Sequence, residues 1–197
     1  SDVCSSDLDL VFSDFEFFSW LYAQWTDTPF VSVANHHQLT RCDVHDEIVD
    51  GFDSSVRLTK AVIQARVPWA DHYLVPSFVD LSVTEPNTRL IPPILRPQFL
   101  DIEPERGDHI LVYQTSYSDY DFSSVLRQVD APMRVYGIRR DIDGPVEDGN
   151  ITWCPISETT FIEDLRTCRG VVASPGFKLM SEALHLGKPY FGIPIRD

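Results

Sequence analysis

Three consecutive residues, Ser174, Pro175 and Gly176, form a pattern that suits the binding of an anion at the start of a helix. Serine is a favoured N-cap, and proline is favoured at the first helical position. Glycine lets an anion come close to the exposed backbone N–H groups of the helix that we predict from Phe177 onward, so the pattern predicts a phosphate site. Plain helix capping explains Ser174 and Pro175 equally well, and this alternative stays open.

Glu182, on the same predicted helix, is placed to bind the sugar part of a nucleotide. At a rise of about 1.5 Å per residue, it lies about 9 Å along the helix axis from Gly176, which is comparable to the span from the phosphate to the ribose of a nucleotide. One carboxylate can accept hydrogen bonds from both ribose hydroxyl groups. A solvated glutamate on the helix surface is the common alternative.

Four residues in the first part of the chain are candidates for a base that deprotonates a hydroxyl group. His36 and His37 follow the predicted strand 30–34, and a free imidazole with a pKa of about 6.5 suits this role. Because side chains alternate along an extended chain, we expect at most one of the two to act. Asp14 and Glu16 are rival bases. A loop histidine bonded to the backbone and an acidic cluster at a helix start are the structural alternatives.

The apolar patterns predict strands that alternate with helices through the whole chain. This order indicates parallel strands covered by helices on both faces, so the predicted fold class is α/β with two Rossmann-like domains. In such sheets a ligand binds beyond the carboxyl ends of the strands, which is where we expect the polar residues above. The predicted strands are 9–14, 30–34, 70–75, 109–114, 133–136, 151–154, 170–173 and 190–193; the predicted helices are 18–25, 46–67, 120–129, 158–168 and 177–185, with a loop over 141–150.

Prolines divide the chain into two parts. Positions 86, 92, 93, 97 and 104 are all proline, and a long helix cannot accommodate them. We therefore predict a partial N-terminal Rossmann-like domain over 9–90, a proline-rich interdomain linker over 91–105 and a partial C-terminal domain over 106–197. Residues 1–8 (SDVCSSDL) lack a methionine and look like translated linker sequence, so we interpret them as a non-native leader. Both domains are expected to be incomplete at the chain ends.

The composition and charge exclude several classes of protein. The 197 residues are 43% hydrophobic and 23% charged, which is ordinary for a folded protein and excludes a disordered or collagen-like chain. A net charge of −14 would repel nucleic acid and anionic membranes, yet it allows a local site for a small anion. The four cysteines form no C-x-x-C pair, and there is no signal peptide or long apolar run, so we predict a cytoplasmic protein with reduced thiols.

The segment SPGFKLMSEALHLGKPYFGIP, residues 174–194, resembles the donor-nucleotide motif of the GT-B glycosyltransferases. It is similar above all to the pattern G-x(4)-SEAL-x(2)-GKP-x(4)-P of the MurG-like nucleotide-sugar transferases. Residues 9–37 resemble the N-domain of that family, IPPILRP at 91–97 resembles its interdomain hinge, and 107–116 resemble the first strand and phosphate loop of its C-terminal domain. The resemblance implies two Rossmann-like domains of the GT-B type, with the acceptor on the N-terminal side and the nucleotide sugar on the C-terminal side, in a fragment of a longer enzyme.

The resemblance also implies roles for particular residues. Glu182 would hold the donor ribose, and the backbone around Ile156 would meet the base. The residues implied at the diphosphate are Gly176, Phe177 and Lys178, with Thr115 and Ser116 facing it from the opposite loop. The residues implied on the acceptor side are Asp14, Glu16, Asn35, His36 and His37.

The activity implied is transfer of a hexose-type sugar from a nucleotide-diphosphate sugar, expected to be UDP-linked, to a hydroxyl acceptor. We expect no metal and no cofactor beyond the sugar donor, because a helix N-terminus can stabilise the departing diphosphate. The acceptor, whether a glycan, a lipid-linked molecule or a small molecule, stays open, as does peripheral contact of the full-length protein with a membrane. A nucleotide-sugar 2-epimerase of the same fold and a non-catalytic nucleotide-sugar-binding protein are the alternatives.

Overall fold

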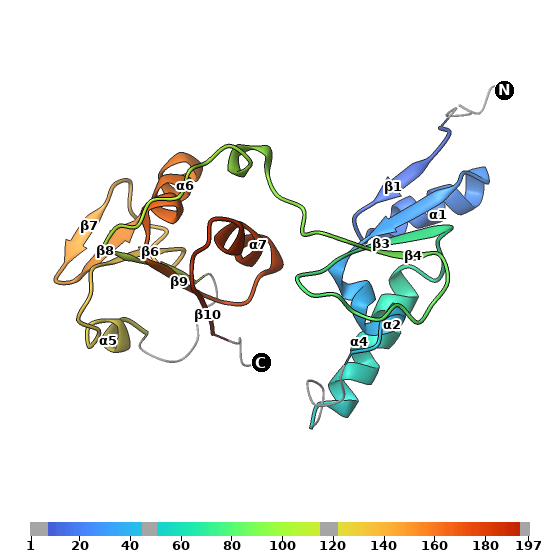
Figure 1. Cartoon of the computed structure of the whole chain (residues 1–197), viewed down its shortest axis with the longest axis horizontal. Helices are drawn as coiled ribbons and strands as arrows, with labels where there is room; N and C mark the ends of the chain where they lie inside the picture. The colour runs from blue at the N-terminus through green and yellow to red at the C-terminus, as the bar shows by residue number, and fades with distance from the viewer. Residues whose placement is uncertain (1–7, 45–50, 115–121, 194–197) are drawn as a thin grey trace. The chain divides into compact units, whose positions relative to one another are not determined.

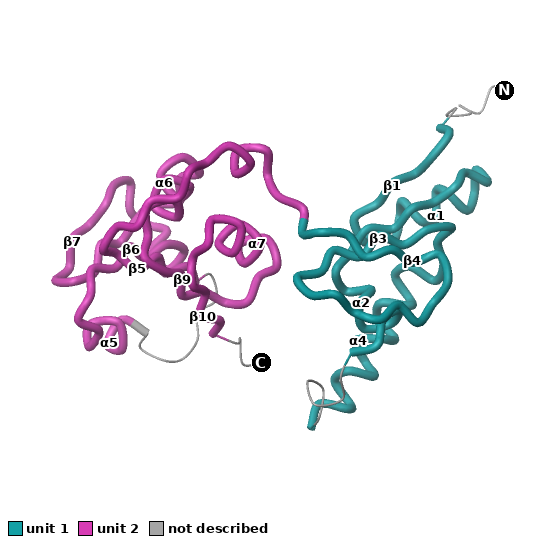
Figure 2. Tube along the Cα trace, viewed as in Figure 1, with its two compact units in different colours: residues 1–93 teal, residues 94–197 magenta. Residues whose placement is uncertain are grey.

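The structure of the chain is a computed structural model that describes residues 8–44, 51–114 and 122–193. Its contacts divide the chain into two compact units, residues 1–93 and 94–197, termed unit 1 and unit 2 (Figure 2). Each unit is built on a sheet of mainly parallel strands with helices in the connections (Figure 1). The predicted α/β class with two Rossmann-like halves is therefore confirmed.

Unit 1 holds a four-stranded sheet whose strands follow one another in chain order, β1-β2-β3-β4. All three pairs of neighbours are parallel. Phe30 of β2 and Val75 of β3 are completely buried, as expected for central strands that are covered on both faces. The elements are β1 (Val11–Ser13), α1 (Phe17–Thr26), β2 (Phe30–Val33), η1 (Asn35–His37), α2 (Gln38–Arg41), α4 (Asp53–Arg66), β3 (His72–Pro76) and β4 (Thr88–Ile91).

Unit 2 holds a six-stranded sheet in the order β10-β9-β5-β6-β8-β7. Every neighbouring pair is parallel except β7 and β8, which form an antiparallel edge. Leu111, Val112 and Ile151 are at most 1% exposed, because the central parallel strands are covered on both faces. The elements are η2 (Pro97–Phe99), β5 (Ile110–Tyr113), α5 (Phe122–Leu126), β6 (Met133–Tyr136), β7 (Val146–Asp148), β8 (Ile151–Cys154), α6 (Glu158–Thr167), β9 (Gly170–Ala173), α7 (Phe177–His185) and β10 (Tyr190–Gly192).

The strand order of unit 2 reverses at β5. From β5 the chain adds β6 and β8 on one side of the sheet, and it then crosses over to add β9 and β10 on the other side. The connections that leave β5 and β9 therefore diverge, and ligands of open parallel sheets bind at this point. The residues that follow these two strands meet there, because the Ser174 hydroxyl donates a hydrogen bond of 2.7 Å to the side-chain oxygen of Gln114.

One element of unit 2 differs from the sequence prediction. The predicted loop 141–150 contains the short strand β7. Gly149, with a φ of 65°, lets the chain reverse after Asp148, so that β7 can pair with β8. The acidic and glycine residues that indicated a loop thus form a hairpin at the edge of the sheet.

The segment predicted as the linker, 91–105, is for the most part an ordered portion of unit 2. The boundary between the units falls between Pro93 and Ile94. Phe99 is completely buried in the core of unit 2, and its carbonyl oxygen lies 3.1 Å from Nε2 of His185. The prolines do prevent a long helix here, but they leave the apolar side chains between them free to enter a core.

Lys188, of the GKP motif, secures the same segment. Its side chain is buried, and its Nζ donates to the carbonyl oxygens of Glu105 and Cys168 at 2.6 and 2.8 Å. Burial lowers the pKa of Lys188. At Gly107, a Cβ atom would come within 2.5 Å of the carbonyl oxygen of Thr167, so only glycine fits this close approach. The hydrogen bonds of Lys188 and the close approach at Gly107 therefore anchor the chain where it enters the sheet of unit 2.

Candidate functional site

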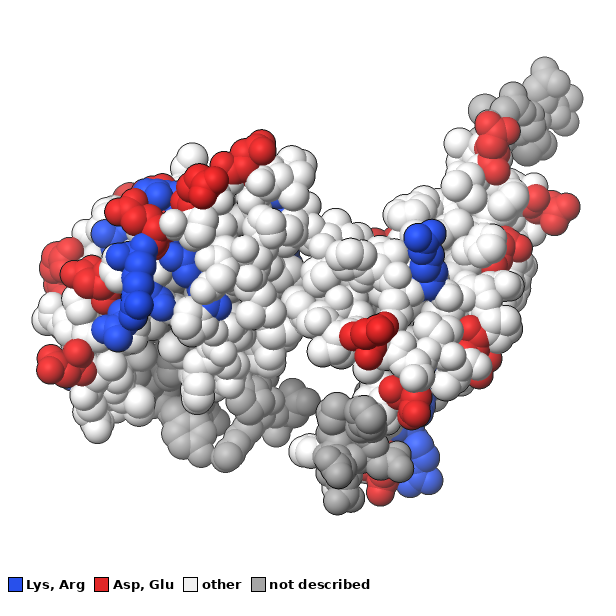
Figure 3. All heavy atoms as spheres, viewed as in Figure 1, with Lys and Arg blue, Asp and Glu red and all other residues white. Residues whose placement is uncertain are grey.

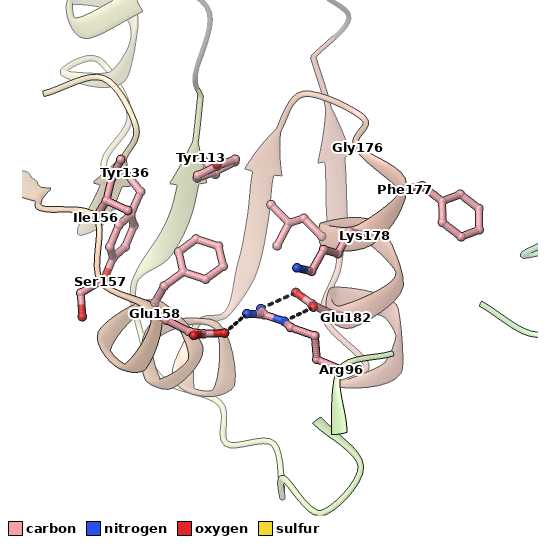
Figure 4. Close-up of a pocket in the computed structure, with 12 residues that line it drawn as sticks. Arg96, Tyr113, Tyr136, Ile156, Ser157, Glu158, Gly176, Phe177, Lys178 and Glu182 are labelled. Atoms are coloured by element: carbon pink, nitrogen blue, oxygen red, sulfur yellow. Dashed lines mark hydrogen bonds and ion pairs between the residues drawn. The ribbon is translucent and has the colours of Figure 1, made fainter. Parts of the chain in front are cut away.

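A pocket of about 460 Å³ lies in unit 2 at the carboxyl edge of its sheet. Tyr113 and Tyr136 are the last residues of β5 and β6, and the other walls come largely from the segments that follow β8 and β9 (Figure 4). This is the place that the reversal of strand order predicts for a ligand. The charged groups of the pocket are those of Arg96, Glu158, Lys178 and Glu182.

Helix α7 begins at this pocket with a glycine as its N-cap. Gly176, with φ −81° and ψ 127°, forms no side-chain capping hydrogen bond of its own. The prediction that Ser174 is the N-cap is wrong, because its hydroxyl donates to Gln114 while its carbonyl oxygen accepts from Tyr190 at 2.7 Å. Plain capping by Ser174 therefore does not explain the pattern, and the positive end of the helix dipole faces the pocket.

Glu182 lies on the buried side of α7, and its side chain is only 2% exposed. The alternative of a solvated surface glutamate is therefore wrong. Arg96 contacts both carboxylate oxygens, with Nε 2.7 Å from Oε1 and Nη2 3.0 Å from Oε2. Its remaining nitrogen, Nη1, lies 2.5 Å from Oε1 of Glu158 at the start of α6 (Figure 4). Two carboxylates and the guanidinium between them thus form one wall of the pocket.

Arg96 is a site residue that the sequence analysis missed. It belongs to the motif IPPILRP, which we interpreted as a hinge, and it is separated from Glu182 by 86 positions in the chain. A lone basic residue among apolar residues and prolines is the signal that could have identified it, because such a charge needs a partner once the segment packs. The hydrogen bonds and charges of Glu182 and Glu158 raise the pKa of Arg96, so its guanidinium remains charged.

Lys178 adds a second cation to the pocket. It is exposed and lies four residues before Glu182, so both side chains project from the same face of α7. Figure 4 shows its ammonium group on the side of the pocket where Glu182 and Arg96 lie. The N-terminus of α7 and this ammonium group together favour a ligand with negative charge.

Aromatic side chains form another wall of the pocket. Phe161 packs edge to face against Tyr113 and Tyr136, with ring centroids 5.5 and 5.1 Å away. The hydroxyl of Tyr136 donates to the buried carboxylate of Asp164 at 2.5 Å, and burial together with this bond raises the pKa of Tyr136. Ile156, which is 70% exposed, extends the wall after β8. A planar, largely apolar group fits against such a surface.

The structure brings the described residues of the predicted donor site together. The ring of Phe177 points away from the charged groups in Figure 4, so its backbone is the part that Phe177 offers to the pocket. Thr115 and Ser116, which we also predicted at the phosphates, lie outside the described residues. The predicted donor residues that line the pocket are Ile156, Gly176, Phe177, Lys178 and Glu182.

The two predicted histidine bases of unit 1 differ in exposure. His36 is exposed and stacks on Phe15, with ring centroids 5.0 Å apart. His37 is 1% exposed, and its Nε2 lies 2.8 Å from the hydroxyl oxygen of Ser32. Both rings contact Phe15, that of His37 at a centroid distance of 5.7 Å, and the two residues lie in the 3-10 turn η1 and not on the extended chain that the alternation argument assumed. A role of His37 as a base does not agree with its burial, and His36 is the accessible imidazole of the pair.

The two acidic candidates of unit 1 also differ. Asp14 is exposed directly after β1. Glu16 is the N-cap of α1, where its Oε2 accepts a hydrogen bond of 3.0 Å from the backbone N–H of Ser19. The structural alternative, an acidic group at a helix start, thus accounts for Glu16. Asp14 remains the acidic candidate for a base.

We expect unit 1 to lose stability through His37 as the pH falls from 6.5 toward 4. Burial, with the nearby charges of Arg41 and His36, lowers the pKa of His37 from 6.5 to about 4. Over this range the unfolded chain binds a proton that the folded unit does not bind, so the contribution is complete above pH 6.5 and declines as the pH is lowered. The change in pKa from 6.5 to about 4 corresponds to roughly 3 kcal/mol.

Urea unfolding at about pH 7.5 and about pH 4.5, read by hydrogen exchange in peptides of unit 1, measures this effect. His37→Gln should flatten the pH dependence, whereas His36→Gln, at an exposed position, should retain it. A pH dependence that His37→Gln leaves unchanged would contradict the role of His37.

Charged side chains of unit 2 also pair outside the pocket. Arg166 pairs with Glu163 at 2.8 Å, and Arg127 pairs with Asp148 at 2.6 Å. Figure 3 shows basic and acidic side chains side by side on one face of this unit. Within the described ranges, no three or more His, Cys, Asp or Glu side chains gather into a group that could hold a metal ion. None of the helices in those ranges is long and apolar enough to span a bilayer.

The model of a protein family described as Glycosyl transferase family 1 matches residues 2–197. Among solved structures, the chain is similar to the crystal structure of CalG4, the calicheamicin glycosyltransferase, with 19% sequence identity, a TM-score of 0.48 and coverage of 94% of this chain and 54% of that chain. The chain therefore spans about half the length of that glycosyltransferase. No curated protein matches the sequence.

Proposed function

The chain belongs to glycosyl transferase family 1, and from this premise we propose that it moves a sugar from a nucleotide-diphosphate sugar to a hydroxyl acceptor. The membership confirms the glycosyltransferase family that the sequence motifs indicated. In this proposal the donor is UDP-linked and binds in the pocket of unit 2, while unit 1 serves an acceptor that is a glycan, a lipid-linked molecule or a small molecule. Cys42, Cys154 and Cys168 are free thiols, which supports a cytoplasmic location.

One observation carries the proposal: the start of α7 and the buried carboxylate of Glu182 line the same pocket. Their separation along the helix axis, about 9 Å, is comparable to the span from a diphosphate to the ribose of a nucleotide. A helix start alone would suit any small anion, but a buried carboxylate beside it favours a ligand that also carries hydroxyl groups. The aromatic wall adds a surface against which the nucleobase of the donor can pack.

Each part of the donor has its own residues in this proposal. Glu182 accepts hydrogen bonds from the ribose hydroxyl groups, and the backbone near Ile156 holds the nucleobase beside the aromatic wall. Backbone N–H groups at a helix start and a lysine ammonium group suit a diphosphate. The residues proposed at the diphosphate are Gly176, Phe177 and Lys178, together with Thr115 and Ser116, which lie outside the described residues.

The charge distribution of the pocket supports transfer as the reaction. When the bond between the sugar and the diphosphate breaks, negative charge grows on the departing diphosphate, and the start of α7 together with Lys178 would stabilise it. We therefore propose a route that uses neither a metal ion nor a cofactor. A base must also take the proton of the acceptor hydroxyl, and we propose His36 for this role, with Asp14 as its rival.

Gly176→Ala should weaken UDP binding about ten- to a hundredfold without harming the fold. A Cβ atom at this position meets nothing closer than the carbonyl oxygen of Ser174 at 3.9 Å, and a φ of −81° suits alanine. A phosphate that lies against the helix start would collide with the new methyl group and lose a charge-assisted hydrogen bond, worth about 1.5–3 kcal/mol. Isothermal titration calorimetry of the 197-residue chain with UDP measures the loss.

Gly144→Ala is the matched control for this experiment. Nothing lies within 4 Å of a Cβ atom at Gly144, and this residue does not line the pocket, so UDP affinity should stay as it is in the unchanged chain. Failure of the unchanged chain to bind UDP would contradict the proposed function. Equal UDP affinities of the unchanged chain and Gly176→Ala would contradict the proposal that the helix start binds the diphosphate.

A further inference from the structure

Both oxygen atoms of Glu182 already have a partner in the structure. Arg96 donates from Nε to Oε1 at 2.7 Å and from Nη2 to Oε2 at 3.0 Å, so the two bonds lie side by side. The Glu182 side chain is 2% exposed and has little other surface to offer. A ligand that binds this carboxylate through two hydrogen bonds must therefore take the place of Arg96.

A vicinal diol is the neutral group that best matches what Arg96 offers to Glu182. The guanidinium presents two parallel N–H donors to the two oxygens, and two neighbouring hydroxyl groups can present two O–H donors in the same way. We propose that Arg96 is an internal competitor of the ligand's diol and thereby sets the affinity of the pocket for a ribonucleotide. This inference rests on the proposed function, in which Glu182 binds the ribose.

Arg96 is the partner that can move. Its side chain is 22% exposed and comes from extended backbone before η2, whereas Glu182 is fixed within α7. Its Nη1 lies 2.5 Å from Glu158, whose side chain is 64% exposed, and its guanidinium lies 5.0 Å from the centre of the Phe99 ring. When a diol replaces it on Glu182, Arg96 keeps a carboxylate partner and an aromatic neighbour, so its charge is not left unpaired.

The apparent affinity of the pocket for a diol ligand equals the affinity of the open site multiplied by the fraction of molecules in which Arg96 does not occupy Glu182. If about nine-tenths of the molecules are in the occupied state, the apparent dissociation constant for a diol ligand is about tenfold higher than that of the open site. A ligand without a diol does not require the exchange, so its affinity does not depend on this fraction. This difference separates competition from a merely structural role of Arg96.

Calorimetry of the whole chain with UDP tests the inference. Arg96→Gln should bind UDP about tenfold more tightly, and Arg96→Lys should show a smaller gain, because an ammonium group cannot contact both oxygens in parallel. A diphosphate of dideoxyuridine that lacks both ribose hydroxyls should gain nothing from either substitution. Arg127→Gln is the control, since Arg127 pairs with Asp148 outside the pocket and should leave UDP affinity unchanged.

A second measurement uses the unchanged chain, so it does not depend on the folding of a variant. In nitrogen-edited NMR spectra, assigned through Arg96→Lys, the Nε–H of Arg96 should exchange slowly with water in the free chain. Its signal should shift when UDP saturates the pocket, because the guanidinium then leaves Glu182.

Equal or weaker UDP binding by Arg96→Gln, or an Arg96 signal that saturating UDP leaves unchanged, would overturn the inference while the proposed function stands. Weak UDP binding by the unchanged chain that becomes tight in Arg96→Gln would support both. Absence of UDP binding by the unchanged chain and by both Arg96 variants would contradict the proposed function, and this inference with it.

Discussion

Glu182→Gln should weaken the binding of UDP about a hundredfold. Glutamine keeps the volume of the buried side chain, but it has no negative charge and only one acceptor oxygen. The two hydrogen bonds from the ribose hydroxyls to the carboxylate are worth about 1.5–3 kcal/mol each. Arg96 binds glutamine more weakly than glutamate, so it competes less with UDP in this variant. This gain of about tenfold in UDP affinity offsets part of the loss and leaves a net decrease of about a hundredfold.

Calorimetry with UDP measures this change, and far-UV circular dichroism shows whether the variant folds. Glu163→Gln is the matched control. Arg166 contacts Glu163 with a similar two-point geometry, at 2.9 and 2.8 Å, but on α6 outside the pocket, so UDP affinity should not change. Unaltered UDP affinity in folded Glu182→Gln would contradict the proposal that Glu182 binds the ribose. It would also contradict the proposed donor site.

His36→Ala is expected to lower turnover about a hundred- to ten-thousandfold at saturating UDP-sugar. A neutral imidazole can take the acceptor proton as the new bond forms, and alanine has no group for this step. His36 is exposed and follows β2 at the carboxyl edge of the unit 1 sheet. UDP affinity should be unchanged, because the proposed donor contacts all come from unit 2.

Release of UDP from UDP-sugars, with a panel of hydroxyl acceptors, measures turnover. His72→Ala is the control, because His72 is also exposed but is the first residue of β3, at the opposite edge of the same sheet. Full turnover in His36→Ala together with loss in Asp14→Asn would assign the base to Asp14. Isomerised UDP-sugar in place of released UDP would contradict transfer and indicate a 2-epimerase.

The regular elements of unit 2 show how far local patterns decide a structure. Strands β6, β8 and β9 span the residues that the apolar runs predict, and α7 spans 177–185 as its amphipathic pattern predicts. Which side chains of a segment must be buried is a local property of the sequence, so periodicity reveals it. The placement of 174–176 at the carboxyl edge follows from the order of the elements, because parallel strands end at one edge of a sheet.

The partners of polar side chains depended on contacts between distant segments. Ser174 is a good N-cap by residue type, yet its hydroxyl bonds to Gln114, which is 60 residues away in the chain. His36 and His37 are equivalent as a sequence pattern, and the packing that places Ser32 beside His37 decides which of them is buried. Hydrogen bonds are short and directional, so a spacing rule does not reveal partners that only folding brings together.

From the sequence by itself came the α/β class, the edge of the sheet that holds the pocket, and Glu182 at a helical distance from the start of α7. Each of these depends on periodicity or on order along the chain. Only the tertiary structure decided that the segment 94–105 belongs to unit 2 and that Arg96 lies on Glu182 across 86 positions of the sequence. A buried charge finds its partner by packing, and packing joins segments whose separation along the chain carries no information about their contact.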